Sequence, residues 1–272
     1  MINLEEIERI IRLAVLSGRI KNEIPLSLMI ISEQEAGKSS VIRKNSQLQR
    51  SVMYVTDATA YGIIRDTQNL ELFEKGHLTH LIIPDLCSCL SRKSATVRTF
   101  MNFMRAMIEE GVVDISTFAT KIATHTKKKK TIRCGFITSI TKDYFYDQHR
   151  AWNKIGFLSR VLPITYKYSV PTRLKILSYI QKQEYHSELV SNYHVPRREI
   201  NVSLPEDFAK MVQPYAITLA DAQKHYGFRL QRQFQVLLKA IALERRSLVV
   251  EEQDWEIFQE LCKYINLDFN VI

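Results

Sequence analysis

Short apolar runs alternate with stretches of helical periodicity over the first 170 residues. The runs have the length and apolar or β-branched character of buried strands, and they cover residues 24–32, 52–57, 79–86, 134–141 and 162–169. Between them, residues 4–17, 37–49 and 94–110 carry apolar side chains at helical spacing. Strands interleaved with helices predict an α/β fold, with a parallel sheet flanked by helices.

The pattern changes after Pro171, where no further strand-like run occurs. Four helical stretches follow, at residues 172–183, 205–213, 228–245 and 251–265. We therefore expect an α/β core over residues 1–170 and a smaller helical domain over residues 171–272. Just before the fourth strand, residues 112–133 alternate and are rich in β-branched side chains, which predicts a hairpin.

Composition limits the classes of protein that this chain can belong to. Hydrophobic residues make up 46% and charged residues 25% of 272 residues, as in ordinary globular proteins. The 38 Lys and Arg exceed the 29 Asp and Glu, and the net charge of +9 favours a polyanionic partner. The four cysteines form no C-x-x-C pair, so neither a zinc site nor a disulfide framework follows.

The start of the chain does not resemble a targeting signal. The first helical stretch carries acidic residues within its apolar pattern, unlike a signal peptide. No apolar run approaches the ~18 residues needed to span a bilayer. We expect a cytoplasmic protein without a membrane partner.

The segment after the first strand, SEQEAGKSS, contains the end of a phosphate-binding motif. The pattern G-x-x-x-x-G-K-[ST] matches at Gly37, Lys38 and Ser39, whereas Ser32 stands in place of its first glycine. In such a loop, backbone N–H groups surround the phosphates, the lysine reaches the β and γ oxygens, and the hydroxyl binds magnesium. The candidate ligands of ATP and Mg²⁺ are Ser32, Ala36, Gly37, Lys38, Ser39 and Ser40.

Two features of the loop oppose nucleotide binding. We expect Ser32 to form a turn in which a glycine would normally adopt positive φ. Glu33 and Glu35 bring negative charge towards an anionic ligand. The alternative is a surface helix that happens to begin with Gly-Lys-Ser.

Asp85 ends the third apolar run and is the candidate second ligand of the magnesium. A carboxylate at this place either holds the metal or acts as a base towards the attacking water. The alternative is an aspartate that caps the following turn.

Several pieces of the chain resemble, in order, the minichromosome-maintenance (MCM) branch of the AAA+ ATPases. They are MIEEGVVDISTFATKI, CGFITSIT and GFLSRVLPITYKYS, followed by FRLQRQFQVLLKAIALERRSLVVEEQDWEIFQEL, which is similar to the lid helices of that family. The resemblance implies an AAA+ core with a helical lid, ATP bound between core and lid, and assembly into oligomers, for which a hexameric ring is one form.

The resemblance also implies roles for individual residues. Lys38 and Ser39 would hold phosphates and Mg²⁺, and Asp85 would be the acid of the Walker B motif. Thr141 would occupy the sensor-1 position, where the family commonly has Asn. Arg160 would be the arginine finger, which in this family acts on ATP bound to the neighbouring subunit. An ordinary surface arginine is the alternative for Arg160.

The lid segment carries the last implied catalytic residue. Arg229 falls on the sensor-2 position, and Arg232, one helical turn further, is the alternative. Several arginines occur in this segment, so a purely structural arginine is a further interpretation.

The predicted hairpin is a candidate DNA-binding element. In the family that the chain resembles, a basic residue on this hairpin contacts the DNA backbone. The corresponding basic residues are Lys121, Lys127, Lys128, Lys129 and Lys130. Positive charge at a reachable tip is sufficient for contacts to phosphates that do not depend on sequence. A solvated lysine loop is the alternative.

These observations predict an ATP-binding AAA+ protein of a replication or mobile-element type. It would be a weak or conditional ATPase acting on DNA, such as a replication initiator, helicase loader or minimal motor. A non-hydrolysing adaptor or structural ring subunit is a second hypothesis, favoured by Ser32, Leu86 and Thr141, which depart from the usual motifs. A basic DNA-binding protein with a vestigial nucleotide site is the third.

Overall fold

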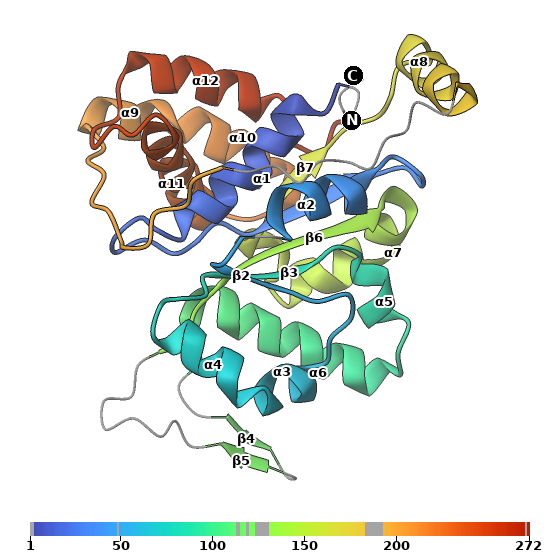
Figure 1. Ribbon diagram of the computed structural model, residues 1–272, viewed down its shortest axis with the longest axis vertical. Coiled ribbons are helices and arrows are strands. Elements are labelled where there is room, and N and C mark those ends of the chain that lie inside the picture. The colour runs from blue at the N-terminus through green and yellow to red at the C-terminus, as the bar shows by residue number, and fades with distance from the viewer. Residues whose placement is uncertain are drawn as a thin grey trace.

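A five-stranded parallel sheet forms the centre of the molecule (Figure 1). The computed structural model describes residues 3–47, 49–112, 115–117, 120–122, 131–182, 193–269 and 271–272. The strands follow the order β2 (Val52–Tyr54), β3 (His80–Ile83), β6 (Gly135–Thr141), β1 (Leu28–Ser32) and β7 (Leu162–Thr165). Every pairing is parallel, which confirms the predicted α/β class.

Helices cover both faces of this sheet (Figure 1). One face packs against α1 (Glu5–Ser17) and α2 (Lys38–Ser46). The opposite face packs against α3 (Ala60–Arg65), α4 (Thr67–Glu74), α5 (Leu86–Leu90), α6 (Ser94–Arg105) and α7 (Lys142–Lys154). Burial on both faces explains why the strands are apolar runs rather than alternating sequences.

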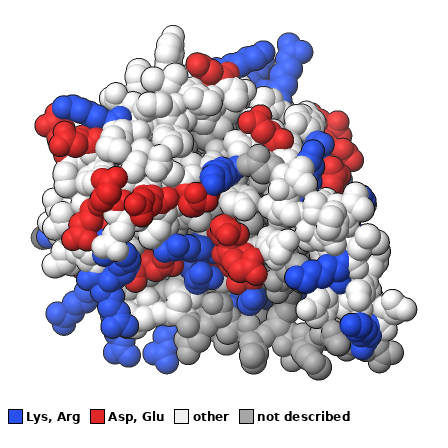
Figure 2. Space-filling model, turned by 90° about the horizontal axis from the view of Figure 1, so that it is seen from above, with Lys and Arg blue, Asp and Glu red and all other residues white. Residues whose placement is uncertain are grey.

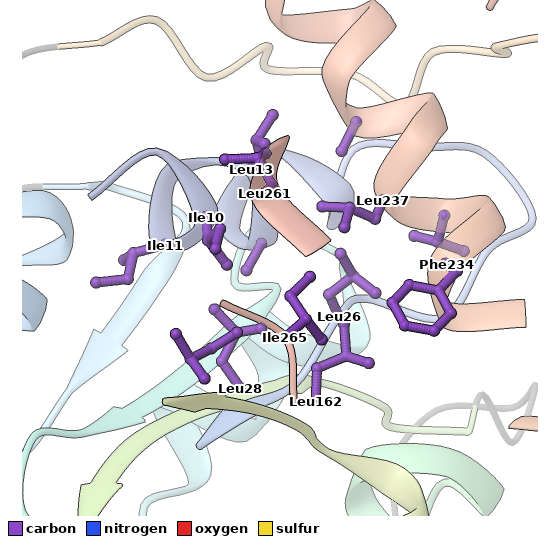
Figure 3. Packing of buried hydrophobic residues seen from close by; sticks show 14 of the residues in the cluster. Ile10, Ile11, Leu13, Leu26, Leu28, Leu162, Phe234, Leu237, Leu261 and Ile265 are labelled. Atoms are coloured by element: carbon purple, nitrogen blue, oxygen red, sulfur yellow. The ribbon is translucent and has the colours of Figure 1, made fainter. Parts of the chain in front are cut away.

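The C-terminal helices share the core of the first sheet face. They are α9 (Glu206–Met211), α10 (Gln213–Gln223), α11 (Phe228–Glu244) and α12 (Glu252–Cys262). Figure 3 shows Phe234 and Leu237 of α11 and Leu261 of α12 in one apolar cluster with Ile10 of α1 and Leu28 of β1. The predicted division into two domains at residue 170 stays a prediction. A continuous apolar cluster joins the C-terminal helices to the sheet.

Three further elements connect these layers. A short π-helix (Ala106–Glu110) extends α6, and a 3-10 turn (Leu158–Arg160) precedes β7. The predicted hairpin contains two antiparallel strands, β4 (Ile115–Thr117) and β5 (Thr120–Ile122). Helix α8 (Val170–Gln181) follows β7 and stands apart from the other helices (Figure 1).

Within the described ranges, no helix has the length and apolar character needed to cross a lipid bilayer.

A neutral histidine is buried where β3 begins. The His80 ring lies 3.0 Å from Thr79 Oγ1 and 3.2 Å from the Leu26 carbonyl oxygen. Gly135 makes room for it, because a Cβ at that position would lie 2.3 Å from the ring. Burial, together with the positive charge of Arg19, lowers the pKa of His80 from 6.5 to about 3. The folded protein therefore holds this side chain uncharged.

We expect His80 to make the fold sensitive to acid. Below pH ~6.5 the unfolded chain binds a proton at this site that the folded chain excludes, so the free energy of unfolding falls by up to about 1.4 kcal/mol per pH unit. Denaturant unfolding between pH 7.5 and pH 4.5 measures the effect in wild type and in His80→Gln. The stability difference between the two should narrow as the pH falls, and parallel curves would contradict the prediction.

Candidate functional site

The predicted nucleotide ligands meet at the carboxyl edge of the sheet. Strands β1 and β6 are neighbours, and Ser32 pairs in register with Thr141. The connection after β1 leads to β2, whereas the connection after β6 leads to β7 on the other side of β1. Open parallel sheets bind ligands where adjacent connections diverge in this way. This switch point falls between the β1–α2 loop, residues 33–37, and the start of α7.

The β1–α2 loop enters α2 through a glycine with a left-handed backbone conformation. Gly37 adopts φ of 78° immediately before α2, a conformation that glycine reaches without steric cost. The first N–H groups of α2 have no partner within the helix, and the helix dipole makes this end positive. The N-terminus of α2 therefore suits a phosphate.

The side chain of Lys38, the first residue of α2, folds back against this loop. Its side chain is 8% exposed, and Nζ donates hydrogen bonds to the carbonyl oxygens of Ser32, at 3.2 Å, and Glu33, at 2.5 Å. Burial lowers the pKa of Lys38, and the negative charge of Asp85 partly opposes this effect. The ammonium group is thus beside the loop backbone and within electrostatic reach of Asp85.

Ser39 and Asp85 flank Pro84. Ser39 Oγ lies 3.5 Å from the Pro84 carbonyl oxygen, which accepts a shorter hydrogen bond of 2.6 Å from Ser139 Oγ. The exposed Asp85 carboxylate accepts a hydrogen bond of 3.0 Å from the Cys87 N–H and so caps α5. The capping interpretation of Asp85 holds, and its exposure leaves the carboxylate accessible to a metal.

These residues suit magnesium better than zinc. Among the described residues, no group of three or more His, Cys, Asp and Glu side chains is arranged to hold a metal ion. Magnesium needs only one or two protein oxygens, because phosphates and water complete its coordination. The hydroxyl of Ser39 and the carboxylate of Asp85 are oxygen ligands of the kind that Mg²⁺ prefers, whereas the described residues contain no group that would hold a metal with protein ligands alone.

Cys87 belongs to this edge, although sequence reasoning did not select it. Burial and the Asp85 carboxylate raise the pKa of the thiol, and the Thr141 backbone opposes that effect through a hydrogen bond. Its position two residues after Asp85 was the feature of the sequence that could have identified it as part of this edge. The thiol is a neutral group between the predicted Walker B and sensor-1 positions.

Ser32 differs from its expected conformation. It is the last residue of β1, has no positive φ, and is completely buried. Its hydroxyl donates a hydrogen bond of 2.7 Å to the Tyr166 carbonyl oxygen. The expectation of a glycine-like turn at Ser32 is wrong, because the chain turns later, at Glu35 and Gly37.

Two tyrosines after β7 hold the same loop. The Tyr166 and Tyr168 hydroxyls both donate to the Ala36 carbonyl oxygen, at 2.7 and 3.0 Å. Tyr166 is fully buried, and burial raises the pKa of its hydroxyl, so the group stays a donor at neutral pH. Together with the Ser32 bond, these contacts fix the loop to the chain that leaves β7.

The two acidic residues of the loop are exposed to solvent, so their charges do not preclude a phosphate nearby. Glu33 is exposed, and its carboxylate lies 3.6 Å from the Lys142 ammonium of α7. Glu35 is exposed as well. Solvent screens exposed charges, so the expected repulsion of an anion is weak here.

Arg160 lies at the opposite edge of the sheet. It precedes β7, so it is at the amino end of the strands, and its side chain is 7% exposed. Its guanidinium forms ion pairs with Glu109, at 2.9 Å, and with Glu110, and donates to the Gly156 carbonyl oxygen. The structure does not bring Arg160 to the Lys38 loop of the same chain.

Arg229 joins Arg160 rather than Lys38. Its Nε lies 2.5 Å from a Glu109 carboxylate oxygen, so one carboxylate bridges both arginines. Arg232, the alternative, lies 3.5 Å from Glu23. A cavity of about 40 Å³ beside these arginines is also lined by Ile24 and Pro25, which precede β1. The length of β1, about 16 Å for five residues, separates this cluster from Lys38.

The candidate DNA-binding lysines are only partly placed. The backbone of Lys121 lies in β5, and Lys127, Lys128, Lys129 and Lys130 lie outside the described residues. Basic and acidic side chains are interspersed on the face shown in Figure 2, so the net charge of +9 forms no continuous basic field on that face. The hairpin is anchored by paired hydrogen bonds between Val112 and Ile132, of 2.9 and 2.8 Å.

Comparison with models of known protein families and with curated proteins gives no match for this chain. Its class therefore follows from its own structure, as an α/β protein with a five-stranded parallel sheet and a glycine-started helix at the carboxyl edge.

Restoring the missing glycine should weaken the protein. Ser32→Gly removes the buried hydrogen bond to Tyr166 and adds a flexible residue to a central strand, so we expect a loss of about 1–3 kcal/mol in unfolding free energy. Ser32→Ala separates the hydroxyl from the backbone effect and should account for part of the loss. Denaturant unfolding measures both, and a Ser32→Gly chain as stable as wild type would contradict the strand assignment.

Proposed function

We propose that this chain is an ATP-binding protein of the AAA+ type, with its nucleotide site at the β1–α2 loop and the first turn of α2. The observation that carries the proposal is the gathering of Lys38, Ser39, Asp85 and Thr141 at one sheet edge, beside a helix that begins at Gly37 with positive φ. The strand order supports the proposal, because the connections diverge beside β1, where open parallel sheets bind their ligands.

In this proposal the loop backbone and Lys38 bind the phosphates. Lys38 exchanges its hydrogen bonds with the Ser32 and Glu33 carbonyl oxygens for stronger charge-assisted bonds to phosphate oxygens. Ser39 and Asp85 hold Mg²⁺, which when bound neutralises phosphate charge. Tyr166 and Tyr168 keep the loop in the binding conformation, so little ordering is required when the nucleotide binds.

Hydrolysis in this proposal needs a second copy of the chain. Arg160 and Arg229 lie at the edge opposite their own loop, and Glu109 and Glu110 neutralise Arg160 in the single chain. A guanidinium at the γ-phosphate stabilises the charge of the transition state, and it can do so from a neighbouring subunit. Turnover is therefore weak in the monomer and conditional on assembly, with a hexameric ring as one closed form.

DNA is the proposed partner of the hairpin. The net charge of +9 and the basic residues between Val112 and Arg133 support a salt-dependent contact with phosphates. The acidic pair Glu109–Glu110 directly precedes the hairpin, and the Glu110 carbonyl oxygen accepts hydrogen bonds from Arg133 at 3.3 Å. If DNA displaced the hairpin, Glu109 and Glu110 would move with it, and these are the residues that pair with Arg160. A replication initiator, helicase loader or minimal motor fits this coupling.

The non-hydrolysing adaptor is the second candidate function. It is favoured by Thr141, which makes no side-chain cap hydrogen bond to α7 and offers one hydroxyl donor where an amide would offer two. In that case ATP binds and supports assembly, and no variant or partner produces turnover.

We expect ATP with Mg²⁺ to stabilise the purified chain, by about 2.7 kcal/mol when the ligand is at 100 times its dissociation constant. Lys38→Ala should abolish the shift in melting temperature. Lys44→Ala is the matched control, because Lys44 lies on the same helix and pairs with Glu8 instead, at 2.7 Å. A wild-type chain that ATP does not stabilise would favour the vestigial site and overturn the proposal.

Mixing two inactive variants tests catalysis across subunits. Arg160→Ala keeps the nucleotide loop but lacks the finger, and Lys38→Ala keeps the finger but cannot hold ATP. We expect each alone to lose about 10³-fold in ATP turnover, and the mixture to recover part of it. An active Arg160→Ala chain would remove the finger role, a mixture without recovery would contradict catalysis across subunits, and absent turnover in wild type would favour the adaptor.

A further inference from the structure

Helix α8 exposes an apolar face that nothing in the described part of the chain covers. Thr172 is its one buried residue, and four large apolar side chains are exposed at helical spacing along one side, namely Val170, Leu174, Leu177 and Ile180. Figure 1 shows α8 standing clear of the sheet and of the other helices. Contiguous exposed apolar surface of this kind marks an interaction site.

The base of α8 is firmly attached. Ser169 caps the helix by accepting a hydrogen bond of 3.2 Å from the Thr172 N–H. The Thr172 hydroxyl donates to the Ile272 carbonyl oxygen at 2.9 Å and accepts from Asn3 Nδ2 at 3.1 Å. The helix therefore projects from a fixed point, and its apolar face has a defined direction.

A second exposed apolar feature lies between α10 and α11. The side chains of Tyr226 and Phe228 are 88% and 80% exposed, and their rings stack with centroids 5.8 Å apart and planes inclined by 13°. Gly227 between them adopts φ of 81°, and a Cβ there would lie 3.0 Å from the Ala220 Cβ. The turn is thus closely packed on α10, and the two rings form a built protrusion.

The two features belong to opposite edges of the molecule. Helix α8 continues from the carboxyl end of β7, on the side of the Lys38 loop. Phe228 is adjacent to Arg229, which shares Glu109 with Arg160 at the amino edge. Two apolar surfaces on opposite edges of one chain can contact each other only between copies, in a head-to-tail arrangement.

We propose that the exposed face of α8 in one copy of this chain docks on the Tyr226–Phe228 pair of the next copy. The direction of this contact rests on the proposed function, in which Arg160 of one copy approaches the nucleotide loop of its neighbour. That approach brings an amino edge against a carboxyl edge, and the same movement brings the aromatic pair towards α8. Aromatic side chains beside arginines are the usual centres of strong protein contacts.

A second copy explains both surfaces with a single contact. Each added subunit buries one α8 face and one aromatic pair and leaves one of each free for the next subunit. Such a heterologous contact produces a closed ring or an open filament, depending on its rotation. An α8–α8 contact would instead give an isologous dimer and would leave Tyr226 and Phe228 exposed.

Cross-linking between variants that each carry one added cysteine distinguishes these arrangements. Leu177→Cys and Phe228→Cys chains are mixed with ATP and Mg²⁺ and treated with a short bismaleimide. Leu177→Cys mixed with Leu248→Cys is the matched control, because Leu177 and Leu248 are both 59% exposed. Wild type measures the background from the native thiols, of which Cys87 is half-buried and Cys89, Cys134 and Cys262 are buried.

We expect the Leu177→Cys and Phe228→Cys mixture to give at least about fivefold more covalent dimer than either chain alone. Dimer from Leu177→Cys alone would indicate α8–α8 pairing and overturn the proposal. Equal dimer with the Leu248→Cys control, or none in any sample, would overturn it as well. Each variant should melt at the wild-type temperature, because all three positions are exposed.

A charged α8 face provides the second measurement. Leu174→Glu with Ile180→Glu, introduced into the Leu177→Cys chain, should abolish the covalent dimer with Phe228→Cys chains, while the melting shift caused by ATP persists. The same two substitutions in the Lys38→Ala and Arg160→Ala chains should abolish the recovery of turnover between these mixed variants. In the Leu177→Cys and Phe228→Cys mixture without these glutamates, a persisting ATP shift without any dimer overturns the docking contact alone. Dimer formation in a chain that ATP does not stabilise overturns the proposed nucleotide site alone.

Discussion

The position of β1 between β6 and β7 is the constraint on which the rest of the structure depends. All five residues of β1 are buried, and the side chains of Leu28, Met29, Ile30 and Ile31 alternate between the two apolar clusters on either side of the sheet. A one-residue shift in register would exchange these faces, so the register is strongly fixed. As a consequence, the chain leaves the sheet at Ser32, beside Thr141, and this exit point sets the position of the loop before α2.

The chain after β7 also holds the β1–α2 loop in its position. Ser32 donates to the Tyr166 backbone, and the Tyr166 and Tyr168 hydroxyls return to Ala36. At the other edge, Glu109 joins Arg160 to Arg229 and lies immediately before the hairpin. The two edges therefore carry different groups, the loop of Gly37 and Lys38 at one and a pair of restrained arginines at the other. Under the proposed function, assembly brings them together, since no single chain can do so across the length of β1.

Sequence reasoning identified the fold class and the five strands, because buried parallel strands are continuous apolar runs. It missed α10, whose first turn contains Pro214; proline suggests a break but is well tolerated at a helix start. It also expected a turn at Ser32, because motif spacing does not report which residue bears positive φ. The predicted roles of Lys38, Asp85 and Arg160 stay predictions that the proposed variants test.

The sequence by itself determined the local elements and the candidate loop of Gly37, Lys38 and Ser39, since periodicity and turn chemistry act over a few residues. The tertiary structure decided which distant groups meet. It brought Asp85 to Lys38, Tyr166 to Ala36, and Arg229 to Glu109 rather than to the loop. Those outcomes depend on strand order and on the packing of α11 against α1, which arise from contacts between residues far apart along the chain.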